Sequence, residues 1–379
     1  MTAIAAFKVN TVPVIIGDIL MTTEGDCGFS ILLPGSGENT KSFIDKHNVY
    51  YYPAKLSQKV TIINKFLMIA TAGSLKVSID FVKHLKNDKK LSTNPSWEYV
   101  NQVIEKFDYD DTQFDFAFVF YYHNKKENIS AISGYNAEKR EVEGFEGLLV
   151  AGSGKDALVD AISKSTYEFS KKDLPNGIKG AHKVNSLLSN LWSLDITNQK
   201  SIENAFGGGY EIGTLKNNEL VKIGDIMFLE IFITGDPEKM LIGLNTRISK
   251  FDYLEDAFII RVNELVPEKS VPIKENINEI YIPKSEKRGF IVLPIDFEGE
   301  YKIDVNINDK LNDLNAEYCN IHLQVAAENG NNLSAVFSQW RPMRNSPVEV
   351  SDSGYLIIPE LWKDILTKAN TFLKDNLSS

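Results

Sequence analysis

The pattern of hydrophobic and polar positions predicts short β-strands interrupted by two pairs of amphipathic helices. β-Branched residues and alternation predict strands over residues 3–8 and 12–18, joined by a turn at Asn10-Thr11. The same features predict that more strands follow, separated by breaks rich in turn-forming residues. These further strands cover residues 59–64, 66–71, 114–123, 128–134, 145–151, 210–215 and 220–226.

Helices are expected where apolar residues recur at a spacing of three and four. The first pair covers residues 72–85 and 97–107, and the second pair covers residues 152–170 and 180–194. Residues 25–55 are rich in Gly, Ser, Asn and Lys and are expected to be irregular. Runs of strands that alternate with pairs of helices indicate stacked layers, with the helices outside two facing sheets.

The chain has 379 residues, more than one average domain, so two domains are expected. We predict that residues 1–232 form a four-layer αββα sandwich of the α+β class and that residues 233–379 form a mainly β extension. Thr234-Gly235-Asp236-Pro237 is the candidate linker, and residues 359–377 are expected to form a closing helix. Strands of the extension are predicted over residues 258–262, 279–283, 289–293, 301–307 and 320–325.

Composition argues against several classes of function. A formal net charge of -10 disfavours a nucleic-acid-binding surface, which usually carries a basic stripe. No apolar run reaches the ~18–20 residues of a transmembrane helix, and the N-terminus lacks the features of a secretory signal. Cys27 and Cys319 are isolated, and the five histidines are scattered rather than spaced as metal ligands. We therefore expect a cytoplasmic protein without a cofactor or a metal.

The candidate chemistry begins at the start of the chain. Thr2 follows Met1, and methionine aminopeptidase usually removes a methionine that precedes a small residue. Its removal would leave an α-amino group on the residue that also carries a β-hydroxyl. Such a residue holds a base beside its own nucleophile, which is one of the arrangements used in covalent catalysis.

Several short motifs follow Thr2 in an order that is typical of one family. They are Gly17-Asp18 at a strand end, Lys59-Val60 at a strand start, Ala72-Gly73-Ser74 before the first helix and Ala151-Gly152-Ser153-Gly154 before the third. From Thr2 to about Ile226 the chain resembles the N-terminal-nucleophile hydrolases, specifically proteasome β-subunits and the bacterial proteasome-like peptidase that works with an ATPase.

The resemblance implies a catalytic role for each matched residue. Thr2 corresponds to the nucleophile, and an α-amino group with an unperturbed pKa of about 7.7–8.0 needs little change to act as a base near pH 7. Lys59 corresponds to the family's lysine, whose charge disfavours a second positive charge on that amine. Asp18 would pair with Lys59 and hold it in place. Lys55 competes for the lysine role, because the segment after Asp18 is longer than usual in the family.

Three further positions complete the implied site. A backbone N–H at Gly73 could donate to the oxyanion of a tetrahedral intermediate, and Ser153 could support the amine by hydrogen bonding. Ser153 could equally be a helix N-cap, a role that is compatible with catalysis. Thr22 stands where the family has a threonine that lines the substrate cleft, beside Gly73.

The sequence thus favours a threonine-type hydrolase that cleaves an amide, expected to be peptidic, through an acyl-enzyme on Thr2. The resemblance also implies self-assembly, in rings or stacked rings, and an ATPase unfoldase as a partner. The alternative is a catalytically silent scaffold for assembly or binding, as proteasome α-type subunits are. Asn204 and Gly207 favour the scaffold, because the family often carries Asp and Ser at what look like those places.

Overall fold

The computed structural model divides the chain into two compact units. The first comprises residues 1–223 and 292–299, and the second comprises residues 224–291 and 300–379. The described residues form a mixed α/β protein in which strands predominate, which confirms the α+β class at this coarse level. The structure describes residues 2–25, 30–35, 39–40, 42–44, 48–93, 95–108, 114–123, 128–164, 184–185, 187–193, 195, 206–234, 241–242, 246–265, 271–272, 280–283, 287–298, 316–326, 332–339, 348–350, 354–357, 363 and 367.

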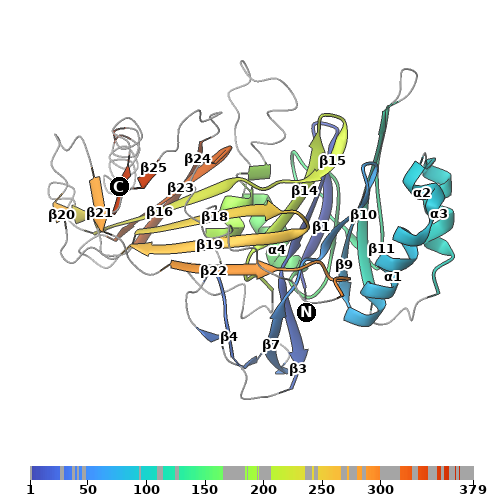
Figure 1. The fold of residues 1–379 in the computed structure, drawn as a ribbon, viewed down its shortest axis with the longest axis horizontal. Coiled ribbons are helices and arrows are strands. Elements are labelled where there is room, and N and C mark those ends of the chain that lie inside the picture. Colours follow the sequence, from blue (N-terminus) through green and yellow to red (C-terminus); the bar gives the residue numbers. More distant parts are fainter. Residues whose placement is uncertain are drawn as a thin grey trace. The chain divides into compact units, whose positions relative to one another are not determined.

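Two antiparallel sheets form the framework of the first unit (Figure 1). The six-stranded sheet contains, in spatial order, β12 (Glu138–Lys139), β13 (Glu146–Ala151), β1 (Ile4–Val9), β2 (Val12–Asp18), β14 (Tyr210–Lys216) and β15 (Glu219–Lys222). The four-stranded sheet contains, in spatial order, β11 (Asn128–Tyr135), β10 (Phe114–His123), β9 (Leu67–Gly73) and β8 (Val60–Asn64).

The hairpin of β1 and β2 lies at the centre of the six-stranded sheet. Its turn residues Asn10 and Thr11 have φ values of 49° and 71°, the left-handed conformation that a two-residue type I′ hairpin requires. This turn sets a register in which Ile4 pairs with Gly17. Nearly every residue of both strands is buried, because both faces of the sheet are covered.

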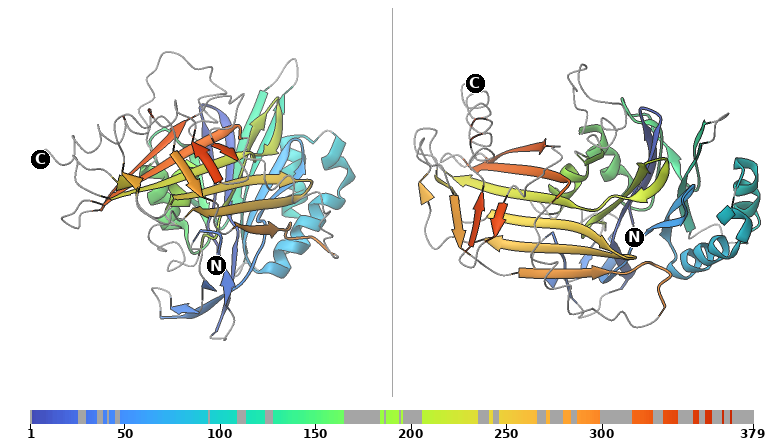
Figure 2. Two further views of the ribbon diagram at one scale, coloured as in Figure 1. Left: turned by 60° about the vertical axis from the view of Figure 1, so that its left-hand side comes forward. Right: turned by 45° about the horizontal axis from the view of Figure 1, so that its top comes forward.

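Two apolar clusters hold the layers of the first unit together. The inter-sheet core joins the two sheets and includes Ile4, Ala6 and Ile15 from one and Met68 and Ala70 from the other. The helix-side core lies on the opposite face of the four-stranded sheet. It packs that face against α1 (Leu75–Asn87), α2 (Lys89–Thr93) and α3 (Trp97–Glu105), as the two views in Figure 2 show.

Helices also lie against the six-stranded sheet. The helix α4 (Lys155–Lys164) contacts β1 and β13, and its Leu158 and Ile162 are fully buried. The described residues 184–185, 187–193 and 195 are helical as well, and all but residue 195 lie within the fourth predicted helix. None of the helices among the described residues is long and apolar enough to cross a membrane.

Differences from the predicted helices have local causes. The first helix begins at Leu75 rather than at position 72, because β9 continues through Gly73. The helix α2 was not predicted; the Asp88 carboxylate accepts from the N–H groups of Lys90 and Leu91 and so caps its start. Such a short helix leaves too little apolar periodicity to detect.

The prediction that residues 25–55 are irregular is wrong for the part that the structure describes. The segment contains the paired strands β4 (Ile31–Leu32) and β5 (Asn39–Thr40). It also contains β6 (Phe43–Ile44) and nearly all of β7 (Tyr50–Leu56), which form a three-stranded sheet with the preceding strand β3 (Leu20–Glu24). Figure 1 and the left view of Figure 2 show β3 and β7 projecting away from the two main sheets. The many turn-forming residues mark the connections between these short strands and obscure the strands themselves.

The second unit is built on a larger sheet, and its described residues are mostly in strands. β16 (Ile226–Thr234) is central and pairs antiparallel with β18 (Thr246–Leu254) and parallel with β23 (Tyr318–Ala326). The other strands of this sheet are β17 (Leu241–Ile242), β19 (Ala257–Leu265), β20 (Val271–Pro272), β22 (Lys287–Val292) and β24 (Asn332–Gln339). A separate sheet contains β21 (Ile280–Pro283), β26 (Gly354–Ile357) and β25 (Val348–Val350).

The division between the units differs from the boundary predicted at 232/233. β16 crosses that boundary and pairs along its length with strands of the second unit, so it belongs to that unit as a whole. Residues 292–299 return to the first unit, which no local signal in the sequence indicates. The predicted strand at 301–307 lies outside the described residues, as does the closing helix 359–377 except for two helical positions, 363 and 367.

Phe81 of α1 is central to the helix-side core, which makes it a test of this packing. Its ring centroid lies 5.1 Å from that of Phe107, 5.3 Å from that of Phe114 and 4.7 Å from that of Phe116. We expect Phe81→Ala to lower the free energy of unfolding by about 3–5 kcal/mol, measured by urea denaturation. The exposed control Lys76→Ala on the same helix should change it by less than about 0.5 kcal/mol. Equal effects of the two substitutions would contradict the described packing.

Candidate functional site

Strand register brings several chain segments to one end of the six-stranded sheet. Ile4 pairs with Gly17 on one side and with Ala151 on the other. Asp18 in turn pairs with Tyr210. The residues just beyond these pairs are therefore neighbours: the start of the chain, the Gly152-Ser153-Gly154 turn and the Gly207-Gly208-Gly209 turn.

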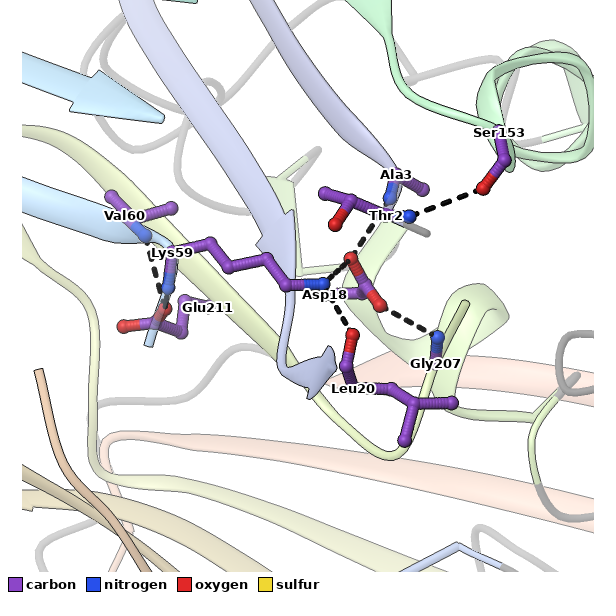
Figure 3. Close-up of polar contacts among 9 residues, drawn as sticks. All are labelled: Thr2, Ala3, Asp18, Leu20, Lys59, Val60, Ser153, Gly207 and Glu211. Atoms are coloured by element: carbon purple, nitrogen blue, oxygen red, sulfur yellow. Dashed lines mark hydrogen bonds and ion pairs between the residues drawn. The ribbon is translucent and has the colours of Figure 1, made fainter. Parts of the chain in front are cut away.

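A buried ion pair forms the centre of this site (Figure 3). The Lys59 ammonium donates to Asp18 Oδ1 at 2.7 Å and to the Leu20 carbonyl at 2.5 Å. Asp18 Oδ1 also accepts from the Ala3 N–H at 2.9 Å, and Oδ2 accepts from the Gly207 N–H at 3.0 Å. The side chains of Asp18 and Lys59 are 0% and 1% exposed, so each charge depends on these partners rather than on water.

Burial and charge act in opposite directions on the protonation of Lys59. Burial lowers the pKa of Lys59 below its ordinary value of 10.5, because removal from water penalises the ammonium. Asp18, by charge and by hydrogen bonding, and then Glu211, by charge, raise the pKa again. The site thus holds a lysine that stays near its two carboxylates while its proton is less tightly held than in water.

Thr2 lies between the ion pair and the turn that precedes α4, as Figure 3 shows. Its backbone N–H donates to Ser153 Oγ at 3.1 Å, and its carbonyl accepts from the Gly154 N–H at 3.1 Å. Its neighbour Ala3 donates to Asp18. Thr2 is therefore fixed from both sides, with its nitrogen directed to a hydroxyl.

Close approach of the backbone at this point requires Gly152. Its φ is +86°, and a Cβ there would lie 2.1 Å from the carbonyl oxygen of Thr2. Gly152 also donates through its N–H to Asp115, the half-buried carboxylate at the start of β10. Burial raises the pKa of Asp115, while the Gly152 N–H and the charge of Lys155 lower it. The turn is thus held to both sheets.

The structure brings Thr2, Asp18, Lys59 and Ser153 of the predicted site residues together. Lys59, and not the competing Lys55, contacts Asp18; Lys55 is exposed on β7. The backbone of Lys59 also meets the strand that carries Gly73, because its carbonyl accepts from the N–H of Thr71 at 3.2 Å.

The other predicted positions are Gly73, Thr22 and Asn204. Gly73 ends β9 as an exposed residue with a φ of 90°. Thr22 lies in β3, two residues beyond the carbonyl of Leu20 that binds Lys59. Asn204 lies outside the described residues. The catalytic roles of these residues, like those of the four residues that lie together, stay predictions.

Sequence reasoning missed two features of the site. Gly207 departs from the family pattern in sequence, yet its N–H binds the Asp18 carboxylate. Glu211, in β14, has a fully buried carboxylate that accepts from the N–H groups of Lys59 and Val60. A glutamate inside the otherwise apolar run Tyr210–Ile212 was the available signal, since a buried carboxylate needs partners.

Comparison with protein-family models gave no match, and comparison with curated proteins gave no relative. The chemistry of the site therefore rests on its own geometry. Within the described ranges, no three His, Cys, Asp or Glu side chains are grouped so that they could hold a metal ion. The arrangement does offer the hydroxyl and the backbone nitrogen of Thr2, with the Asp18–Lys59 ion pair beside them. It also offers the Ser153 hydroxyl, which accepts a hydrogen bond from that nitrogen.

Gly152 allows a matched test of the Thr2 geometry. Gly152→Ala should lower the free energy of unfolding by about 2 kcal/mol more than Gly147→Ala, because the new methyl group meets the Thr2 carbonyl. Gly147 is a suitable control, since its φ is +64° and no atom lies within 4 Å of the place that a Cβ would take, so only backbone strain of about 1–2 kcal/mol remains. Urea denaturation measures both; similar losses would contradict the close approach.

Lys59 generates a prediction about pH. Burial lowers the pKa of Lys59 in the folded protein below the value of 10.5 that it has in the unfolded chain. At a pH between these two pKa values, the folded protein therefore binds fewer protons at Lys59 than the unfolded chain does. The contribution of Lys59 to the free energy of unfolding is constant below the folded pKa and rises with pH between the two values. The free energy of unfolding of the wild type, relative to Lys59→Met, should therefore increase from neutral pH toward 10.5 in urea titrations. Substitution of the exposed Lys55 by Met should not reproduce this trend. A flat or falling difference for Lys59 would contradict the lowered pKa and show that Asp18 and Glu211 outweigh the effect of burial.

Proposed function

We propose that this protein is a threonine-type amide hydrolase of the N-terminal-nucleophile class that acts on a peptidic bond. The observation that carries the proposal is the convergence on Thr2 of the Ser153 hydroxyl, at its nitrogen, and of the Asp18–Lys59 ion pair. In the proposal, processing exposes Thr2 as the first residue, and its N–H becomes an α-amine. That amine is the base and the Thr2 hydroxyl is the nucleophile.

Acylation follows directly from this assignment. The amine takes the hydroxyl proton while Oγ1 of Thr2 bonds to the acyl carbon, and the oxyanion accepts a hydrogen bond from the Gly73 N–H. The C–N bond then breaks, and the leaving amine takes the proton from the Thr2 nitrogen. The product is an ester on Thr2. Water next attacks the ester carbon while the Thr2 amine accepts its proton. The bond between the acyl carbon and Oγ1 of Thr2 then breaks, and the amine returns that proton to Oγ1, so that the acid leaves and the hydroxyl is restored.

The charges around Thr2 support an amine that is neutral near pH 7. An ammonium on Lys59 disfavours a second positive charge nearby and so lowers the pKa of the amine. Asp18 holds that ammonium at 2.7 Å and keeps the pair in place. Ser153 Oγ accepts one hydrogen from the Thr2 nitrogen, which directs that nitrogen and leaves its lone pair for the hydroxyl proton.

The fold of the first unit is consistent with the proposal. Two sheets share the inter-sheet core, α1–α3 cover one outer face and α4 lies against the other sheet, which together favour the αββα sandwich of this hydrolase class. The resemblance of the motifs makes self-assembly and cooperation with an ATPase unfoldase further parts of the proposal. Substrate is proposed to bind near Thr22 and Gly73.

A catalytically silent scaffold is the second candidate, and one observation favours it. With a residue preceding it, Thr2 is only 2% exposed, so its hydroxyl is not open to a large substrate in that form. Gly207 favours the scaffold hypothesis less than its place in the sequence implied, because its N–H donates a hydrogen bond to the Asp18 carboxylate. The two candidates differ in whether Thr2 becomes a reactive chain start.

The proposal is tested by the mass and the reactivity of the mature protein. Intact-mass spectrometry should show a chain that begins at Thr2. A peptidyl β-lactone should add its full mass to Thr2, because attack on the lactone carbonyl opens the ring without a leaving group. Lys59→Met should slow the addition by about 10²-fold, within the range that proton transfer contributes.

Two variants control this experiment. Thr2→Ser keeps a hydroxyl and an amine on one residue and should still be labelled, whereas Thr2→Ala should not be. A residue retained before Thr2 in the mature chain would exclude the amine base and leave the scaffold. Labelling that persists in Thr2→Ala would place the nucleophile elsewhere.

A further inference from the structure

The carboxylate of Glu211 is fully buried and takes no part in the mechanism above. It lies on β14 beside Gly17 of β2, with which it pairs. Oε2 accepts from the N–H of Lys59 at 2.7 Å and from the N–H of Val60 at 3.1 Å. The Glu211 side chain is 0% exposed and binds two successive N–H groups. It therefore fixes the backbone of Lys59 and Val60.

Glu211 has a counter-ion on the next strand. Lys222, which ends β15, donates to Oε1 of Glu211 at 2.7 Å, and its side chain is 11% exposed. Lys222 also donates to the side-chain carbonyl of Gln58. The Gln58 side chain donates in turn to the carbonyl of Val292 at 2.6 Å, and its N–H donates to that of Leu293 at 2.9 Å. The residue before Lys59 is therefore held in place through both its side chain and its backbone.

Gly17 makes this arrangement sterically feasible. A Cβ at Gly17 would lie 3.1 Å from Cγ2 of Val60 and 3.5 Å from Cβ of Lys59. The absence of a side chain lets the start of β8 approach β2 closely, within reach of the Glu211 carboxylate on the neighbouring strand. Lys59 is then anchored at its N–H by Glu211, at its carbonyl by Thr71 and at its ammonium by Asp18.

We propose that Glu211, with Lys222 as its counter-ion, is a positioning residue that fixes Lys59 against Asp18 beside the nucleophile. This inference rests on the proposed function for its catalytic consequence, but the position and charge state of Lys59 are measurable without it. Glu211 does not touch the reacting atoms; it acts through the lysine.

Glu211 acts by charge as well as by hydrogen bonding. Asp18 from β2 and Glu211 from β14 are the carboxylates that favour the ammonium form of Lys59 against its burial. Lys222 from β15 faces Glu211 and offsets part of its negative charge. Neutralising Glu211 should therefore favour the neutral amine of Lys59, and neutralising Lys222 should favour the ammonium. A purely structural carboxylate would not give opposite effects.

The experiment measures the titration of Lys59 by the ¹³Cε chemical shift in the full-length protein. In Glu211→Gln the titration should move to lower pH, and in Lys222→Gln it should move to higher pH. Lys222→Gln is the milder change, at a partly exposed side chain, and keeps the test informative where Glu211→Gln fails to fold. Thr214→Val is the matched control on β14: it removes the buried bond from Thr214 Oγ1 to the Pro13 carbonyl and should leave the titration in place.

The rate of β-lactone addition to Thr2 provides the catalytic test. Glu211→Gln should slow it on the order of 10-fold, less than the ~10²–10⁴ that general acid–base catalysis contributes as a whole. Thr214→Val, at similar loss of stability, should leave the rate unchanged.

The outcomes separate this inference from the proposed function. Opposite shifts of the Lys59 titration, with a slower reaction of Glu211→Gln, support it. An unmoved titration in the folded variants, or shifts of the same sign, overturns it whether or not Thr2 reacts. A wild type that does not react at Thr2 defeats the proposed function, while the titration still decides whether Glu211 positions Lys59. A shifted titration with an unchanged rate in a reactive protein overturns the proposal that positioning of Lys59 by Glu211 speeds the reaction of Thr2.

Discussion

The ion pair between Asp18 and Lys59 is buried almost completely, and burial of two charges constrains everything around it. An ion taken out of water is costly unless its partners are close and well directed. Here the Asp18 carboxylate receives the Lys59 ammonium and the N–H groups of Ala3 and Gly207, and the ammonium also reaches the Leu20 carbonyl. These contacts join the two strands of the β1–β2 hairpin to the segments around Lys59 and Gly207. Loss of either charge would leave the other unpaired in the interior.

Glycines make the convergence sterically possible. Gly152 lets the turn before α4 meet the Thr2 carbonyl, and Gly17 lets the start of β8 approach β2. Gly207 has a φ of 112° and presents its N–H to Asp18. At each of the three positions a side chain would obstruct either the backbone conformation or the close approach of a neighbouring segment. These glycines thus let the segments around Thr2 approach one another closely.

Local signals predicted much of the first unit and part of the site. The hairpin of β1 and β2 and the bounds of β10 follow from alternation and from the turn at Asn10-Thr11, because these are determined by neighbours in the sequence. Asp18 and Lys59 were placed as a pair by motif order. Glu211 was not foreseen, since its partners are backbone N–H groups about 150 positions away. The sequence also did not predict that residues 292–299 belong to the first unit, because long-range contacts leave no periodic pattern in the sequence.

The central claim is that the ion pair makes the Thr2 nitrogen a base near neutral pH. The most direct measurement is the pKa of the α-amino group at Thr2 in the mature protein, followed by NMR of a protein labelled at threonine. The account predicts a pKa below the unperturbed range of about 7.7–8.0, and a return toward that range when the charge of Lys59 is removed. An amine that titrates at or above that range in the wild type would contradict it.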